Sequence, residues 1–269
     1  TMSNGAVLAN WGTLNIQADI NIWTSGSPSP RIDNYGTFRK SNTAGITNIT
    51  IVFYNYGAVK INTGTLYFTG GYTQITGETI LGGGDLAANG TINILGGSLS
   101  GFGDINASVN NAGKVNPGDS LGCLKIMGTY SQTSTGGIDI QIRGRNVCSQ
   151  FDKLIITGNA TFQGKLNIAL INPFRPIDND SFQIISYGTR TGKFDTVSGL
   201  NIGSGFRFDT LFTSNFVTLK CIAPLNTLPI ASNDTVITPE NKPISISVLK
   251  NDSDADGDTV ILYKFYQQI

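Results

Sequence analysis

Four aspartates at alternate positions are the residues of this sequence whose types and spacing best suit a chemical site. They are Asp252, Asp254, Asp256 and Asp258, with Gly257 between the last two. Carboxylate oxygens at such spacing, with a glycine that tightens the loop, are ligands that Ca²⁺ prefers. The loop is not an EF-hand, because its flanks are strand-like and no glutamate stands at the twelfth position. The sequence therefore offers two interpretations, a Ca²⁺ site on these four aspartates and a solvated acidic turn.

Catalytic groups are scarce in the rest of the chain. There is no histidine, and the only glutamates are Glu78 and Glu240. Enzymes that cleave polysaccharides need clustered carboxylates. The few acidic residues of the first hundred positions form no close pair in sequence, although neighbouring repeats can bring two together. Asp178 and Asp180 form the closest later pair and are typical of a turn before a strand. We therefore expect no enzymatic activity.

The three cysteines, Cys123, Cys148 and Cys221, are too few and too scattered for a disulfide scaffold or a zinc site. A bridge between Cys123 and Cys148 is one possibility, because they lie about one repeat apart. Three isolated buried thiols are the interpretation that the sequence favours.

The charge and hydropathy of the chain limit the kinds of molecule to which it can bind. The chain has 18 basic and 18 acidic residues, so its formal net charge is zero. A neutral chain lacks the electrostatic attraction that drives binding to nucleic acids or anionic membranes. Its longest apolar runs are far shorter than the ~20 residues of a transmembrane helix. The polar, turn-rich start is unlike a signal peptide and suggests a mature product. We expect neither nucleic-acid binding nor membrane insertion.

A short phrase recurs along the first half of the chain. It combines Asn, usually an aromatic residue, and Gly, at 10–12, 34–36, 55–57 and 111–113. A period of 20 to 24 residues with short alternating strands is typical of a solenoid of stacked coils. Asn at equivalent corners has two interpretations, a ladder of side-chain amides that bond from coil to coil and an exposed row of side chains that binds sugars. The ladder is the interpretation that the sequence favours. Glycine clusters such as 101–103 are expected at corners.

From about residue 110 to residue 200 the sequence resembles the C-terminal part of bacterial β-helical surface proteins, which include autotransporter passengers and filamentous-adhesin-like proteins. The resemblance rests on 117–122, 128–132, 151–158 and 164–167, which occur in the order seen in that family. Phenylalanine is frequent here, as expected for a larger hydrophobic cap that closes a solenoid. The resemblance implies display on a bacterial surface.

Residues 223–230 are rich in proline and predict a linker. The segments 231–241, 243–249 and 251–258 beyond it are similar to the opening half of a bacterial cadherin-like or immunoglobulin-like adhesin repeat. Such modules run to ~100 residues, so the module in 231–269 is incomplete. In that family, aspartates of this kind bind calcium at or near module junctions, which supports the Ca²⁺ interpretation of the acidic loop.

These observations together predict an all-β protein. We expect a right-handed parallel β-helix over 1–222, a linker at 223–230 and a partial β-sandwich segment over 231–269. The predicted function is structural and adhesive, as a stalk, adhesin or fibre subunit that is secreted or displayed on a bacterial cell and self-associates through its C-terminal strand segment or binds surface glycans. The alternative is a β-helix that binds or degrades carbohydrates.

Overall fold

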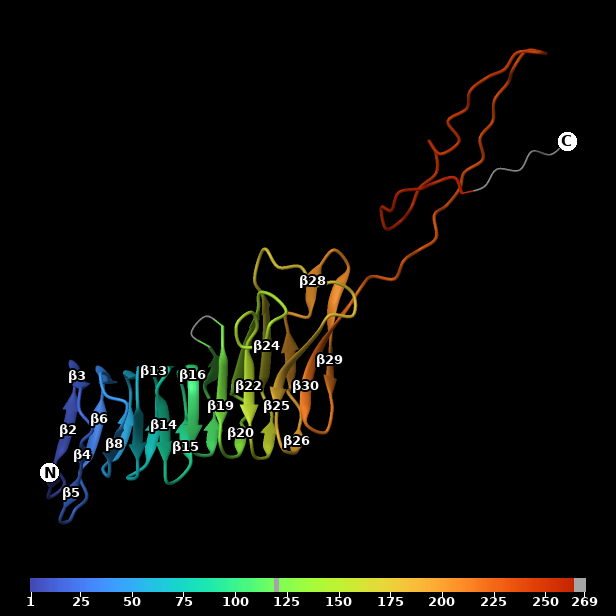
Figure 1. Ribbon diagram of the computed structural model, residues 1–269. Helices are drawn as coiled ribbons and strands as arrows, with labels where there is room; N and C mark the ends of the chain where they lie inside the picture. Colours follow the sequence, from blue (N-terminus) through green and yellow to red (C-terminus); the bar gives the residue numbers. More distant parts are fainter. Residues whose placement is uncertain (119–120, 264–269) are drawn as a thin grey trace. The chain divides into compact units, whose positions relative to one another are not determined.

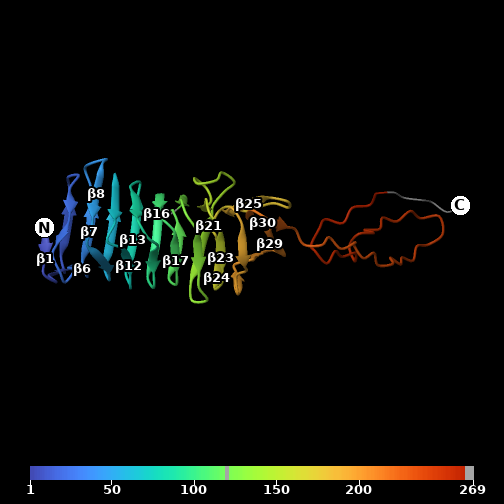
Figure 2. The same cartoon turned by 90° about the horizontal axis from the view of Figure 1, so that it is seen from below.

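The computed structural model describes residues 1–118 and 121–263. Asp119 and Ser120 of the segment 117–122, and the last six residues of the predicted module, lie outside the described residues. All regular structure among the described residues is β-strand, so the predicted all-β class is confirmed. Contacts divide the chain into two units, Thr1–Ala223 and Pro224–Ile269. Figures 1 and 2 show the strands of the first unit stacked along its length from the N-terminal repeats onward, with β30 between β25 and β29 at the C-terminal end.

Nine strands of the first unit form a sheet in which every pairing is parallel. Each strand pairs with the strand of the next sequence repeat, so Asn10 lies opposite Asn34 and Asn34 opposite Asn55. The nine strands are β2 (Val7–Asn10), β6 (Arg31–Asn34), β9 (Val52–Asn55), β12 (Tyr72–Gln74), β15 (Ile92–Ile94), β17 (Val109–Asn111), β20 (Tyr130–Gln132), β23 (Ala160–Phe162) and β26 (Arg190–Gly192).

A second sheet has nineteen strands and contains two further parallel columns. One column, here called the outer column, consists of β3 (Thr13–Ile16), β7 (Thr37–Lys40), β10 (Ala58–Ile61), β13 (Glu78–Gly82), β16 (Ser98–Asn106), β18 (Lys114–Pro117), β21 (Gly137–Ile142), β24 (Lys165–Leu170) and β27 (Thr196–Ser198). The other consists of β4 (Asn21–Ile22), β8 (Ile46–Ile49), β11 (Thr65–Phe68), β14 (Asp85–Ala88), the second half of β16, β19 (Cys123–Ile126), β22 (Lys153–Ile156) and β25 (Ser181–Ser186). We call the strands that one repeat contributes to the columns a rung.

The second sheet becomes antiparallel at its C-terminal end and is therefore mixed. β25 pairs with β30 (Phe216–Ile222), which pairs with β29 (Phe206–Phe212), and β29 pairs with β28 (Asn201–Gly203). At the other end, β1 (Met2–Ser3) and β5 (Thr24–Ser25) form a separate two-stranded sheet. Phe182 on β25 packs against Phe208 on β29, as expected for a cap rich in phenylalanine.

Side chains alternate between the interior and the surface along the strands, because a β-strand has a period of two. In β9 and β10 alternate residues are buried. Rings from successive strands meet inside, where Phe53 contacts Phe38, Phe68 and Tyr72 at centroid distances of 5.0, 5.0 and 5.7 Å. The interior of the first unit is thus a continuous hydrophobic core shared by all three columns.

The predicted ladder of amides is confirmed. Asn10 donates its Nδ2 hydrogen to Asn34 Oδ1 at 2.7 Å, and Asn34 donates to Asn55 Oδ1 at 2.8 Å. Asn55 in turn lies 3.4 Å from Gln74 Oε1. Asn34, Asn55 and Gln74 are fully buried and also donate to backbone carbonyls, so their polarity is satisfied inside the core.

The corner expected at 101–103 is where β16 passes from the outer column to the next column, and Gly101 and Gly103 both have positive φ there. Two other sequence-based expectations need correction. Cys123 and Cys148 form a disulfide, so only Cys221 is a free buried thiol. Sequence separation alone did not show that their Cα atoms lie 4.8 Å apart, within reach of a bridge.

The partial β-sandwich is also not formed as strands. Among the described residues of Pro224–Ile269 the only ladder contact is an isolated bridge between Ile230 and Ser253. Alternating residues such as Ile244 and Ile246 are exposed instead of packed. The physical reason is the lack of a facing sheet, because a sandwich needs a second layer to cover its apolar positions.

Candidate functional site

The four aspartates of the C-terminal loop lie within the second unit, and each described contact ties them to the backbone or a hydroxyl. Asp252 Oδ1 accepts a hydrogen bond from the Ser232 amide at 2.8 Å. Asp254 Oδ1 accepts from the amides of Asp256 and Asp258, at 2.8 and 3.2 Å. These bonds close a tight turn around Gly257, whose φ of +80° requires glycine.

Asp256 connects the loop to the start of the unit. Its Oδ2 accepts from the hydroxyl of Thr227 at 2.7 Å and from the amide of the same residue. These hydrogen bonds lower the pKa of Asp256 below its usual value. In the part of the chain that the structure describes, no group of three or more acidic, cysteine or histidine side chains is placed to hold a metal.

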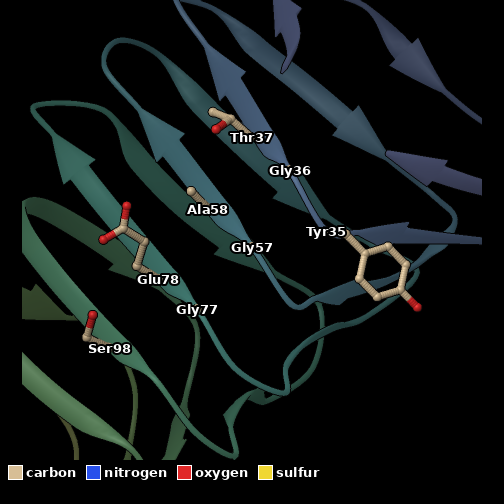
Figure 3. A pocket seen from close by; sticks show the side chains of 8 residues that line it. All are labelled: Tyr35, Gly36, Thr37, Gly57, Ala58, Gly77, Glu78 and Ser98. Atoms are coloured by element: carbon tan, nitrogen blue, oxygen red, sulfur yellow. The ribbon is translucent and has the colours of Figure 1, made fainter. Parts of the chain in front are cut away.

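A groove in the first unit follows a column of stacked glycines. Gly36, Gly57, Gly77 and Gly97 occupy the same corner in four successive rungs. A Cβ on Gly57 would lie 2.2 Å from the carbonyl oxygen of Gly36, and one on Gly77 would lie 2.0 Å from that of Gly57. No side chain fits there, so the corner is left as a shallow hollow of about 550 Å³ (Figure 3).

The floor of this hollow is backbone that already has its hydrogen-bond partners. The amides of Thr37, Ala58, Glu78 and Ser98 each donate to the carbonyl of a glycine in the preceding rung, at 2.8 to 2.9 Å. The floor therefore offers no free strand edge to a ligand, and recognition depends on the side chains along the two sides of the groove.

An apolar stripe runs beside the corner, and its member Tyr35 lines the hollow. Each member directly follows the last residue of a strand of the nine-stranded sheet, and the backbone amide of each of the last five bonds to the preceding rung. The stripe consists of Trp11, Tyr35, Tyr56, Ile75, Leu95 and Ala112. Trp11 and Tyr35 stack at 4.1 Å and Tyr35 and Tyr56 at 4.7 Å. Both faces of Tyr35 are covered, and Figure 3 shows its ring and hydroxyl pointing away from the side chains of Thr37, Ala58, Glu78 and Ser98.

The groove continues into a second, polar hollow of about 300 Å³. Glu78 and Ser98 line both hollows, which therefore adjoin along the outer column. Other polar side chains of the second hollow are Ser100 on β16, Asn116 on β18, Asp139 and Gln141 on β21, and Asp152 beyond β21. From β7 to β21 the groove crosses six strands, about 24 Å at ~4.8 Å per strand.

Asp152 is the most perturbed carboxyl group of this hollow. Its side chain is buried, and its two oxygens accept hydrogen bonds from the amides of Gly122 at 2.9 Å and Gln141 at 2.8 Å. Burial raises the pKa of Asp152 to about 7, and the two amide donors only partly oppose this shift. Asp152 thus links β21 to Gly122, the residue before β19, and its carboxyl group takes up a proton more readily than that of an ordinary aspartate.

The other two carboxylates are more exposed and have cationic neighbours. Glu78 Oε1 lies 3.5 Å from the Nζ of Lys60, and Asp139 Oδ2 lies 4.0 Å from the Nζ of Lys114. Asp139 Oδ1 accepts a hydrogen bond from Asn167. Each lysine partly offsets the negative charge of its carboxylate partner, although neither lysine is among the residues that line the hollows.

Sequence reasoning did not identify this groove, although it anticipated that neighbouring repeats could bring carboxylates together. Glu78, Asp139 and Asp152 are 61 and 13 residues apart and resemble isolated surface charges in the sequence. The available signal was the repeat: Glu78 and Ser98 each follow a corner glycine, and aligning the repeats on those glycines places them on one face.

Comparison with known protein families gives a match in the C-terminal part of the chain. Residues 226–268 match the family model of the bacterial Ig domain. This match supports the predicted immunoglobulin-like adhesin repeat. A search of curated proteins found no match to the chain. Among the described residues, no helix is long and apolar enough to cross a membrane.

Proposed function

We propose that this chain is part of a bacterial protein that is secreted or displayed on the cell surface and has a structural and adhesive role, as a stalk, adhesin or fibre subunit. The observation that carries the proposal is the match of residues 226–268 to the bacterial Ig domain. An Ig-like domain on a chain that also contains a long stack of strands suits an extended protein with a large surface for binding.

The proposed architecture of the first unit is a right-handed parallel β-helix. Parallel pairing between successive repeats supports it in three columns, and so does the ladder of buried amides. In a solenoid each rung contacts only the rungs before and after it, so adding rungs lengthens the stack. The antiparallel strands β28 to β30 would then close one end of the core.

The disulfide between Cys123 and Cys148 supports a location outside the cytoplasm. Disulfides persist in oxidising compartments and are rare where thiols are kept reduced. The bridge closes a sequence separation of 25 residues, and constraining such a loop stabilises a fold by about 3 kcal/mol.

Self-association through the C-terminal segment is part of the proposal. Ile244, Ile246 and Val248 are exposed at 50, 44 and 39% and alternate with serines, which is the pattern of a strand with one apolar face. Adding such a segment to the sheet of another copy would cover these residues. The Ile244→Lys/Ile246→Lys variant should remain monomeric in sedimentation-velocity experiments in which the parent chain forms larger species, and equal sedimentation of both would contradict this step.

We propose no enzymatic activity. Binding of carbohydrate is the alternative function, and the groove along the outer column favours it, because its side chains present several hydrogen-bond acceptors on adjacent rungs.

The surface location is tested on intact cells that produce the protein. A membrane-impermeant amine-reactive label should modify the chain without lysis, and peptide mapping should recover Cys123 linked to Cys148. Labelling only after lysis, together with reduced Cys123 and Cys148, would contradict the proposal.

A further inference from the structure

The chain contains two Asn-Gly pairs, and the structure holds them differently. Asn89–Gly90 lies in the turn between β14 and β15, and Asn4–Gly5 lies in the turn between β1 and β2. In an Asn-Gly pair the backbone nitrogen of the glycine can attack the side-chain amide of the asparagine, because no Cβ hinders its approach. The two pairs share this local chemistry, so a difference in their reactivity in the folded chain comes from the fold.

The backbone nitrogen of Gly90 is open to such an attack. Asn89 and Gly90 are both exposed, and a Cβ built on Gly90 would meet no atom within 4 Å. Among the described residues no backbone carbonyl accepts a hydrogen bond from the Gly90 amide. The nitrogen can therefore move toward Cγ of Asn89 without breaking a backbone hydrogen bond.

The side-chain carbonyl of Asn89 is polarised from a neighbouring strand. Tyr67 on β11 donates its hydroxyl hydrogen to Oδ1 of Asn89. β11 pairs in parallel with β14, and Tyr67 lies opposite Ala87, so its side chain reaches the turn that follows β14. Attack at Cγ moves negative charge onto Oδ1, and a donor already aimed at that oxygen stabilises the charge.

The Asn4–Gly5 pair is held in place instead. The Gly5 amide donates to the carbonyl oxygen of Pro28 at 2.6 Å. A Cβ built on Gly5 would lie 2.9 Å from Cγ of Pro28, so the turn is also closely packed. Attack on Asn4 requires this hydrogen bond to break, and we therefore expect the folded chain to protect this pair.

We propose that Asn89–Gly90 is a site of self-modification, at which Asn89 is converted to aspartate and isoaspartate through a succinimide. The Gly90 nitrogen bonds to Cγ of Asn89, and its proton leaves with the side-chain nitrogen as ammonia. Water then adds to either carbonyl carbon of the cyclic imide and opens the ring. Each conversion consumes a water molecule and releases an ammonia molecule, and nothing is oxidised or reduced.

The conversion changes the turn in two ways. It adds a negative charge to a chain whose formal net charge is zero. In the isoaspartate product the backbone runs through the side chain of residue 89, so the turn between β14 and β15 becomes longer by a methylene group. The site therefore makes a slow, one-way change of surface charge. This inference needs no ligand, partner or cellular location, and it is independent of the proposed function.

The test follows both pairs in the purified chain, incubated at mildly alkaline pH in water enriched in heavy oxygen. Peptide mapping by mass spectrometry measures the heavy oxygen incorporated at Asn4 and at Asn89, which reports only conversion during the incubation. In the folded chain we expect Asn89 to convert at least about tenfold faster than Asn4, equivalent to ~1.4 kcal/mol in activation free energy. In the urea-unfolded chain the two should convert at similar rates.

Tyr67→Phe tests the role of the hydroxyl, because it keeps the ring and removes the donor. Conversion at Asn89 should slow by about three- to tenfold in the folded chain, the effect of one hydrogen bond of ordinary strength. The rate in urea should not change, which separates this effect from one on local sequence. Tyr54→Phe on β9 is the matched control, because it removes another tyrosine hydroxyl, and its rate at Asn89 should equal that of the parent.

Equal rates at Asn4 and Asn89 in the folded chain would overturn the inference. It would also be overturned if Asn89 stayed unconverted in the folded chain under conditions that convert it in urea. Conversion at the parent rate in folded Tyr67→Phe would overturn the role assigned to the tyrosine. None of these outcomes bears on surface labelling of intact cells.

Discussion

The corner glycines make a sharp prediction about stability. Gly57 lies between two rungs, and a Cβ added to it would lie 2.2 Å from Gly36 O, 2.5 Å from Tyr35 O and 2.6 Å from Tyr35 C. These are backbone atoms, so no side-chain rotation relieves the contact. Gly57→Ala must therefore push the two rungs apart.

The cost of Gly57→Ala follows from the bonds that would be stretched. The amide of Ala58 donates to Gly36 O at 2.8 Å, and that of Gly57 donates to Asn34 O at 2.9 Å. Overpacking costs about 1–3 kcal/mol, and weakening one buried backbone hydrogen bond adds about 1 kcal/mol. We expect a loss of about 2–4 kcal/mol in the free energy of unfolding, or roughly 5–15 °C in melting temperature for a unit of this size.

Gly90→Ala is the matched control. A Cβ at Gly90 meets no atom within 4 Å, so this variant should lie within about 0.5 kcal/mol of the parent. Both variants are compared by circular dichroism during thermal and urea unfolding. Equal melting temperatures for Gly57→Ala, Gly90→Ala and the parent would refute the argument that the rungs stack closely at this corner.

Three further predictions concern charged groups. Lys40 is fully buried and donates to Asp19 at 2.8 Å, and this hydrogen bond lowers the pKa of Asp19. The pair should therefore stabilise the fold above the unfolded Asp pKa of about 3.9, and this stabilisation should be lost as pH falls through the lower folded pKa. Urea unfolding of the Asp19→Asn variant should lack this acid dependence. Burial raises the pKa of Asp152 to about 7. The free energy of unfolding should therefore fall as pH rises from about 4 to 7, by at most about 1.4 kcal/mol per pH unit. If the Asp152→Asn variant showed the same dependence of its free energy of unfolding on pH, this assignment would be contradicted. If the aspartate loop rearranges to bind Ca²⁺, calorimetry should detect binding that Asp254→Asn/Asp256→Asn abolishes, whereas no heat with the parent chain would favour the solvated turn.

Much of the first unit was predictable because its repeats carry local signals. Asn34 and Asn55 recur before a corner glycine, and an amide at such a position can bond to its equivalent in the next repeat. The alternation of apolar and polar residues likewise indicated which face of each strand is buried. These signals depend on residues close in sequence, and the structure confirmed the amide ladder and the all-β class.

Features that depend on stacking between distant residues were not predictable. Lys40 occupies an inward position between Ile16 and Ile61, where the pattern predicts an apolar residue. It is accommodated because Asp19, Thr43 and Thr47 supply acceptors for its ammonium group. The carboxylates of the groove were missed for the same reason, since Glu78 and Asp139 face one hollow only after the rungs are stacked.

Successive repeats of the first unit stack in parallel register, one strand spacing apart. Pulsed electron paramagnetic resonance between spin labels on introduced cysteines, with Cys221→Ser to remove the free thiol, tests it directly. Along the outer column Thr37 and Lys114 are four strand spacings apart, and Thr37 and Lys165 are six. Parallel stacking predicts backbone separations of about 19 and about 29 Å, from ~4.8 Å per strand. Two distances that do not differ by about 10 Å would contradict it.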